Sequence, residues 1–235
     1  MKPYYETELG KLYHGDCLKI MPELEPVDLV LTDPPYGMNN NTDSDRFSGG
    51  NISSIRRRGT SSSRFEGKII GDDKPFNPLP FLKYPNVILF GYNHFAQNLP
   101  RGTLLVWIKR FDTAFGTFLS DAEIVWMKNG IGIYCKRDTS ITAEAKNRLH
   151  PNQKPMPIIQ WYIEKSKTNG LILDPFIGSG TTAIVCERLK RKWIGIEIEE
   201  KYCEIAAKRI EENLTVPERI ERSEKGITKK TGLLF

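Results

Sequence analysis

The chain has 235 residues, of which 39 % are hydrophobic and 27 % charged, an ordinary composition for a soluble globular protein. This length suits one sizeable core and is short for two, so a single domain over residues 1–235 is predicted. The sequence shows no bilayer-length apolar run and no secretory signal, which excludes a membrane-spanning protein and predicts a cytoplasmic one. Lys and Arg total 34 against 29 acidic residues, and this net charge of +5 permits a polyanionic partner.

The four cysteines and three histidines are scattered along the chain, and no Cys-x-x-Cys pair occurs. A zinc site needs closely spaced ligands, and a disulfide framework needs paired cysteines in an oxidising compartment. Neither is expected here, and no metal is assigned to the chain.

The most informative motif follows the apolar run at residues 27–31. Pro34 and Pro35 cannot donate to a sheet ladder, so a buried strand must end at Asp33 in a stiff, extended segment. The Asp33 carboxylate and the Pro34 carbonyl then face a cleft as a pair of hydrogen-bond acceptors. Such a pair suits the exocyclic amine of a nucleobase, and Tyr36 offers a face on which a base drawn out of a duplex could stack. Taken alone, the motif is equally typical of a strand-ending turn with a capping aspartate.

A polar stretch without periodicity follows from residue 39 to residue 75. Within it, residues 44–64 carry seven serines, three glycines and five arginines against the single acid Asp45. Such a segment cannot bury enough apolar surface to offset its chain entropy. A mobile basic insertion is therefore predicted over residues 39–75.

Short apolar runs bounded by turn residues then continue the chain. Strands are predicted at residues 12–16, 86–91, 103–108, 123–127 and 130–135, the last two as a hairpin, with short helices at residues 17–24 and 94–99. A polar link at residues 136–149 precedes a helix that Pro155 opens. Past Pro217, residues 217–235 are expected to form a loose basic tail.

A second motif lies between a buried strand at residues 171–173 and a helix at residues 183–190. It is a tight loop with the pattern Gly178-x-Gly180, and Glu197 ends the next strand, 19 residues after Gly178. That spacing suits an acid that grips ribose hydroxyls. Asp174 stands directly before the loop, where a phosphate would be repelled, so a dinucleotide is less suited than a cationic nucleoside. S-adenosylmethionine fits, and the alternative is a glycine loop kept only for close packing.

Three motifs in one order resemble the amino-methylating DNA methyltransferases of the permuted β group, the DNA methylase N-4/N-6 family, and in particular its small phage-like members. They are residues 33–36 (Asp-Pro-Pro-Tyr), 150–155 (His-Pro-Asn-Gln-Lys-Pro) and 174–182, and they extend the resemblance from about residue 12 to residue 214. It implies an α/β fold with a Rossmann-like, seven-stranded, mostly parallel sheet, in circularly permuted order with the catalytic block first. It also implies S-adenosylmethionine as the cofactor, double-stranded DNA with a flipped target base as the partner, and adenine or cytosine as the target.

The resemblance assigns the candidate site residues. The catalytic residues are Asp33, Pro34, Pro35 and Tyr36, and the cofactor residues are Asp16, Lys154, Asp174, Phe176, Gly178, Ser179, Gly180, Thr181, Thr182 and Glu197. Asp16 matches the position that meets the adenine of the cofactor, Glu197 the ribose acid, and Lys154 the lysine near the methionine carboxylate. Residues 90–95, 106–109 and 121–126 are weaker matches, in which Trp107 and Trp126 are expected to be core aromatics.

The resemblance also implies a target-recognition segment before His150, and here only a reduced link at residues 136–149 is present. The basic insertion begins beside Tyr36, so it is predicted to take part in DNA binding. Four arginines are expected to grip phosphates and to order the loop on DNA: Arg56, Arg57, Arg58 and Arg64.

Adenine N6 is the favoured acceptor, because an aspartate at position 33 leans toward adenine in the family. Cytosine N4 is the near alternative, and a catalytically silent DNA-binding relative is the alternative from another class. An NAD-dependent oxidoreductase is disfavoured by Asp174 and by the lack of an acid/base pair for hydride transfer. A homodimer is left open.

Overall fold

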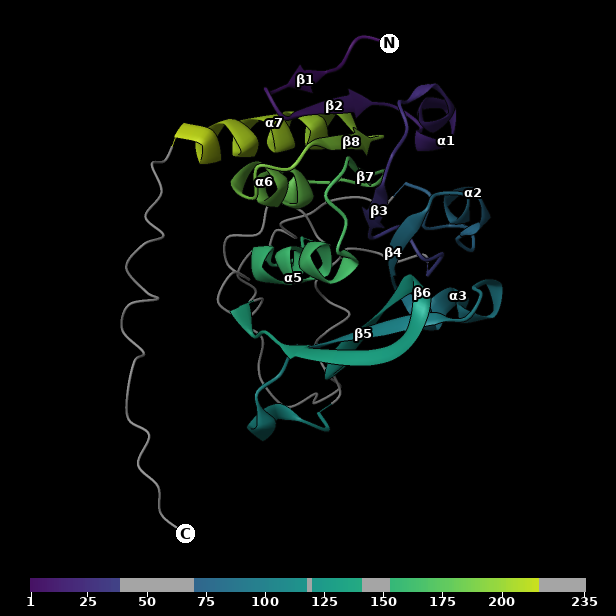
Figure 1. Cartoon of the computed structure of the whole chain (residues 1–235). Helices are drawn as coiled ribbons and strands as arrows, with labels where there is room; N and C mark the ends of the chain where they lie inside the picture. Colours follow the sequence, from purple (N-terminus) through teal and green to yellow (C-terminus); the bar gives the residue numbers. More distant parts are fainter. Residues whose placement is uncertain (39–69, 118–119, 141–152, 216–235) are drawn as a thin grey trace, which may run out of the picture.

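The structure is a computed structural model, and it describes residues 1–38, 70–117, 120–140 and 153–215 (Figure 1). The four arginines of the predicted DNA contact lie outside these ranges, as do residues 39–69 of the insertion, residues 141–149 of the link and the 217–235 tail. Residues 70–75 of the predicted insertion are described, and Asp72 within them is buried.

One mixed sheet runs through the molecule, and its strands are mostly parallel. The strands are β1 (Tyr5–Glu6), β2 (Gly10–His14), β3 (Leu29–Thr32), β4 (Asn86–Phe90), β5 (Gly102–Ile108), β6 (Ala122–Arg137), β7 (Ile172–Asp174) and β8 (Trp193–Glu197). Their order in the sheet is β1-β2-β8-β7-β3-β4-β6-β5. The described residues thus form eight strands where seven were expected. The additional strand β1 was not predicted, because a two-residue edge strand is too short to show a period.

Helices cover both faces of this sheet (Figure 1). The longer ones, α5 (Met156–Ser166), α6 (Thr181–Arg188) and α7 (Glu200–Thr215), lie side by side on one face. The short ones, α1 (Cys17–Ile20), α2 (Leu79–Leu82) and α3 (Tyr92–Phe95), lie on the other, with 3-10 turns η1 (Met21–Glu23), η3 (Ala96–Asn98) and η4 (Asp112–Ala114). The helix predicted at residues 94–99 is in fact α3 followed by η3. No helix in the described ranges is long and apolar enough to cross a membrane.

The catalytic strand β3 is buried on both faces, as its continuous apolar run predicts for a central parallel strand. Leu29 and Leu31 pack in the cluster under α5, α6 and α7, whereas Val30 packs in the cluster under α1 and α2. β3, β7 and β8 run in the same direction, so their carboxyl ends meet at one edge of the sheet. That edge is where open α/β sheets bind ligands.

The two strands predicted at residues 123–127 and 130–135 are the arms of a single bent strand, β6. Asn129 and Gly130, both with φ of 71°, form the bend. The predicted hairpin is wrong, because the two arms pair with β5 and not with each other. β5 pairs with both arms: Thr103 faces Met127 in the first arm, and Leu105 faces Tyr134 in the second. Glu123 lies near the start of the first arm, at the same level as Trp107 of β5.

Candidate active site

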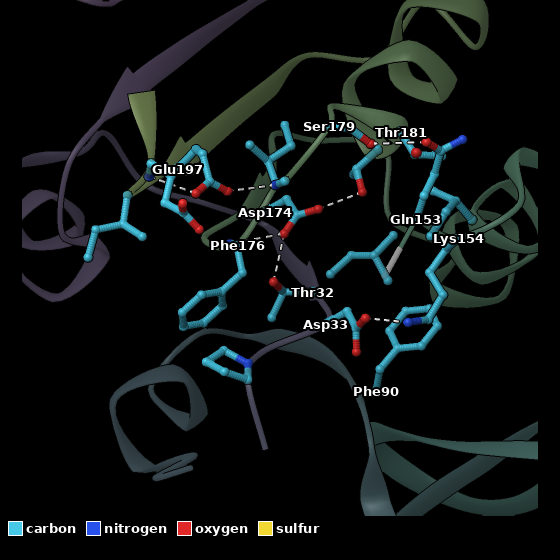
Figure 2. Close-up of a pocket in the computed structure, with 18 of the residues that line it drawn as sticks. Thr32, Asp33, Phe90, Gln153, Lys154, Asp174, Phe176, Ser179, Thr181 and Glu197 are labelled. Atoms are coloured by element: carbon cyan, nitrogen blue, oxygen red, sulfur yellow. Dashed lines mark hydrogen bonds and ion pairs between the residues drawn. The ribbon is translucent and has the colours of Figure 1, made fainter. Parts of the chain in front are cut away.

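A cavity opens at the edge of the sheet where β3, β7 and β8 end (Figure 2). It brings together ten of the predicted site residues: Asp33, Pro35, Lys154, Asp174, Phe176, Gly178, Ser179, Thr181, Thr182 and Glu197. Four carboxylates line it (Asp33, Asp174, Glu197 and Glu199) against the single ammonium of Lys154. This charge balance suits a cationic ligand with hydroxyl groups and opposes a phosphate.

Asp174, at the end of β7, joins the two motifs. Its carboxylate accepts hydrogen bonds of 2.6 Å from the hydroxyls of Thr32 and Thr182, and a third of 3.2 Å from the amide of Phe176 (Figure 2). Thr32 ends β3 directly before Asp33, whereas Thr182 lies in the first turn of α6. Burial raises the pKa of Asp174 to about 6, although these hydrogen bonds oppose the rise. One buried carboxylate therefore fixes the end of the catalytic strand to the cofactor loop.

Glu197, at the end of β8, holds the other side of the loop. Its carboxylate accepts the amide of Gly178 at 2.9 Å and the amide of Glu199 at 2.8 Å. Burial raises the pKa of Glu197, and the two backbone hydrogen bonds counteract this. Each carboxylate oxygen keeps acceptor capacity, so Glu197 can still bind a ribose hydroxyl.

Gly180 has a left-handed φ of 83° at the start of α6, and a Cβ there would lie 3.0 Å from the Cβ of Ala206. The loop therefore packs directly on α7. From the same helix, Arg209 donates to the backbone carbonyl of Ser179 and, at 2.8 Å, to its hydroxyl. Arg209 was not predicted as a site residue, because it lies outside every motif.

Asp33 does not stand free in the cavity. The hydroxyl of Tyr36 donates to one of its oxygens, and the Lys154 ammonium forms an ion pair with the other (Figure 2). Burial raises the pKa of Asp33, and the charge of Lys154 opposes that rise. Lys154 lines the cavity and its Nζ lies at Asp33. Its expected contact with the methionine part of the cofactor stays a prediction. Pro34 is buried and is not among the residues that line the cavity, so the contact of its carbonyl with a ligand stays a prediction.

The ring of Tyr36 is also engaged, and it does not line the cavity. It stacks on the imidazole of His94, with ring centroids 4.6 Å apart and an interplanar angle of 10°. A Cβ on Gly91 would lie 2.1 Å from Cε1 of Tyr36, so only glycine allows this approach, and its φ of 76° is left-handed as well. Tyr36 is therefore held from three sides: Asp33, His94 and Gly91.

Asp16 lies in a second hollow that adjoins the first. The aromatic rings of Phe76 and Phe81 line the second hollow, and the two hollows share Pro35, Ile70, Phe176, Glu197 and Ile198. One Asp16 oxygen caps α1 by accepting the amide of Leu18 at 2.9 Å. An acid and aromatic walls next to Glu197, the acid predicted to bind the ribose, form a fitting site for a purine ring.

The weaker sequence matches supply the residues that were missed. Residues 90–95 hold His94, residues 106–109 end with Lys109, and residues 121–126 contain Glu123. Lys109 donates to Glu123 at 3.0 Å, and Glu123 lies 3.9 Å from the Nζ of Lys154. Trp107 and Trp126 are 0 % and 1 % exposed, so they are the core aromatics that were expected.

The fold and the cavity together define an S-adenosylmethionine-dependent methyltransferase. A family model described as DNA methylase matches residues 106–208. The type II methyltransferase M.BamHI from Bacillus amyloliquefaciens is 30 % identical over 301 residues, covering 99 % of this chain and 67 % of that one. M2.LlaDCHI from Lactococcus lactis subsp. cremoris is 28 % identical over 260 residues, covering 91 % of this chain and 94 % of that one. The chain belongs to the N4/N6 DNA methylase family.

Solved structures share the fold. The PvuII DNA methyltransferase, described as cytosine-N4-specific, aligns with a TM-score of 0.54 at 16 % identity and covers 90 % of this chain and 93 % of that one. The M1.HpyAVI–SAM complex aligns with a TM-score of 0.51 at 19 % identity, covering 86 % and 100 %. The Rossmann-like methyltransferase fold predicted from the sequence is confirmed.

S-adenosylmethionine is the methyl donor of this family, and the residues present fit it. The acidic lining suits the sulfonium, Glu197 suits the ribose, and the hollow beside Asp16 and Phe176 suits the adenine. When bound, the cofactor supplies an electrophilic methyl group to this edge of the sheet.

Proposed function

We propose that the protein transfers a methyl group from S-adenosylmethionine to the N6 amino group of adenine in DNA. One observation carries the proposal: Asp33 and the cofactor loop leave adjacent parallel strands, and Asp174 ties them together through Thr32 and Thr182. A methyl acceptor bound at Asp33 is thereby held beside the donor, and such positioning is the main source of catalysis in a direct transfer.

Asp33 and the Pro34 carbonyl accept hydrogen bonds from the two N–H groups of the target amine. These contacts localise the lone pair of the nitrogen, which is otherwise delocalised into the ring, and stabilise the positive charge that develops as the bond to carbon forms. The amine becomes acidic during this step, so Asp33 need not be a strong base. Tyr36 orients the Asp33 carboxylate through its hydroxyl. Because His94 stacks on one face of the Tyr36 ring, a flipped base would have to stack on the opposite face or displace His94.

Cytosine N4 is the second candidate acceptor, because the same two acceptors serve either amine. Asp33 favours adenine through the family resemblance, whereas the PvuII enzyme of similar fold is described as cytosine-N4-specific. Digestion of DNA from cells expressing the protein, followed by mass spectrometry of the nucleosides, separates the two. We expect N6-methyladenine; N4-methylcytosine alone would overturn the choice of base.

The same assay addresses the alternative of a silent DNA-binding relative. If purified protein with S-adenosylmethionine modifies neither base on unmethylated genomic DNA, yet binds that DNA, the proposed activity is wrong. The hydrogen bond that ties Gly178 to Glu197 keeps the cofactor loop in shape, and this supports an active enzyme.

DNA binding is assigned to the basic insertion at residues 39–75, and a homodimer is compatible with this assignment. Arg56, Arg57, Arg58 and Arg64 would contact phosphates on either side of the flipped base. Removing one arginine–phosphate contact should reduce the magnitude of the slope of log affinity against log salt by about 0.9. Replacing Arg56–Arg58 with alanine should flatten this slope and leave cofactor affinity unchanged; an unaltered slope would move the DNA-binding surface to the 136–149 link or the tail.

A further inference from the structure

Four charged side chains of alternating sign lie in a row beside the catalytic motif. Asp33 is paired with Lys154, the Nζ of Lys154 lies 3.9 Å from Oε2 of Glu123, and Oε1 of Glu123 accepts from Lys109 at 3.0 Å. They come from four separate parts of the chain: the ends of β3 and β5, the start of β6 and the approach to α5. The sheet order β3-β4-β6-β5 places those parts next to one another.

The row is largely shielded from water. The side chains of Lys154 and Asp33 are 12 % and 14 % exposed, and those of Lys109 and Glu123 are 18 % and 29 % exposed. Charges in such surroundings interact more strongly than at the surface, and removing one leaves its neighbour uncompensated. The row therefore acts as a unit.

Lys154 is the member whose placement needs explaining. A lysine ammonium is a point charge on a flexible four-carbon stem, and fixing that stem costs rotamer entropy. The ring of Phe90 lies under Nζ at 5.0 Å from its centroid, and Asp33 and Glu123 attract it from two directions. Glu123 itself is anchored by Lys109.

We propose that Glu123 is a positioning residue for methyl transfer: it holds the Lys154 ammonium against Asp33, so that the Asp33 carboxylate stays ionised and oriented toward the target amine. The inference rests on the proposed function, and it gives Lys154 a role toward Asp33 in addition to the one expected toward the cofactor. In this proposal Glu123 acts through Lys154.

Glu123 can change the pKa of Asp33 in two opposite ways, and the sign of the change when Glu123 is replaced distinguishes them. The negative charge of Glu123 raises the pKa of Asp33 directly, whereas Lys154 lowers it. If Glu123 acts only through its field, removing its charge lowers the pKa of Asp33; if it positions Lys154, removal raises that pKa. The titratable groups that face Asp33 in the described structure are Tyr36, Lys154, Glu123, Asp174 and, from α5, Tyr162.

The test is a carboxyl-carbon NMR titration of Asp33 in the wild type and in Glu123→Gln, with Asp33→Asn to assign the signal. We expect a higher pKa for Asp33 in Glu123→Gln and a value near the wild type in Glu123→Asp. An unchanged or lower pKa in Glu123→Gln would overturn the inference. Thermal unfolding checks that each variant is folded, and Glu123→Ala replaces Glu123→Gln if the latter fails to fold.

Single-turnover rates across pH provide the second readout. Glu123→Gln should move the acidic limb of the profile to higher pH, so the rate of the variant should fall further below that of the wild type as the pH is lowered. The matched control is Asp112→Asn, which removes the exposed Asp112–Arg137 ion pair and should leave the profile unchanged. If Glu123→Gln lowered only the affinity for S-adenosylmethionine, Lys154 would act only in cofactor binding and the inference would be wrong. If the wild type methylates no DNA, the proposed function fails, while the titration still decides the role of Glu123.

Discussion

The two ends of the cavity are built in different ways. At the cofactor end, Asp174 and Glu197 are held by neutral donors, which are hydroxyls and backbone amides. At the catalytic end, Asp33 is held by a lysine ammonium from 121 residues further along the chain and by a hydroxyl. The first arrangement belongs to the binding of a ligand of fixed charge. The second places a lysine ammonium next to the carboxylate that we propose to bind the target amine.

We therefore expect variants at the catalytic end to lower the rate of methyl transfer and variants at the cofactor end to lower the affinity for S-adenosylmethionine. Neutral hydrogen bonds fix the loop without depending on another segment's charge. The ion pair at Asp33 depends on the position of Lys154, so the catalytic end is the more sensitive to pH and to salt.

Asp33→Ala is expected to have the largest effect of the variants at the two ends. It removes an acceptor aimed at the target amine, so the single-turnover rate should fall by about 100- to 1000-fold or more. Calorimetry should find S-adenosylmethionine binding nearly unchanged. A loss of cofactor binding as severe as that of Glu197→Ala would mean that the two ends are not separate.

Glu197→Gln tests the other end. It replaces a buried carboxylate that accepts two amides, so S-adenosylmethionine affinity should fall by about 10- to 100-fold, the usual range for a charge-assisted hydrogen bond. The rate at saturating cofactor should change far less than in Asp33→Ala. Glu204→Gln, on the surface of α7, serves as the control.

Tyr36→Phe measures how much of the methyl-transfer rate depends on the Tyr36 hydroxyl. It removes the donor to Asp33 and keeps the ring on His94, so a rate loss of about tenfold is expected. Tyr36→Ala should weaken binding of DNA with an unpaired target base by a further ~1 to 3 kcal/mol. Equal binding losses in the two variants would show that the hydroxyl matters more than the ring.

The smallest expected effect concerns stability. The pKa of Asp174 is about 6 in the folded protein against an ordinary value of 3.8, so the native state binds the proton first. Protonation of Asp174 therefore stabilises the folded state fully below pH 4, and this stabilisation is lost as the pH rises through 6. Relative to Asp174→Asn, the wild type should gain unfolding free energy on the order of 2 kcal/mol between pH 7 and pH 4. Denaturant titrations at both pH values measure this; a pH-independent difference would contradict it.

The sequence allowed the cofactor end to be predicted and most of the sheet with it. Asp174, Gly178 and Glu197 stand in one continuous stretch, and their spacing encodes a strand, a tight turn and a second strand. The catalytic end is assembled from distant segments, and neither Glu123 nor His94 has a local pattern that marks it. Their contacts follow from the bend of β6 and the position of α3, which are products of tertiary packing.

The strand order has a consequence for how the protein is made. β7 and β8, the last of the described strands to be synthesised, fill the space between β2 and β3, two of the earliest. Until the ribosome has released residues 172–197, β2 and β3 present unpaired edges to each other across a gap. During most of that interval Asp33 has neither Lys154 nor Asp174 beside it. We therefore expect a nascent chain to be inactive until β7 and β8 have joined the sheet. We expect it to be most prone to aggregation while the edges of β2 and β3 are unpaired.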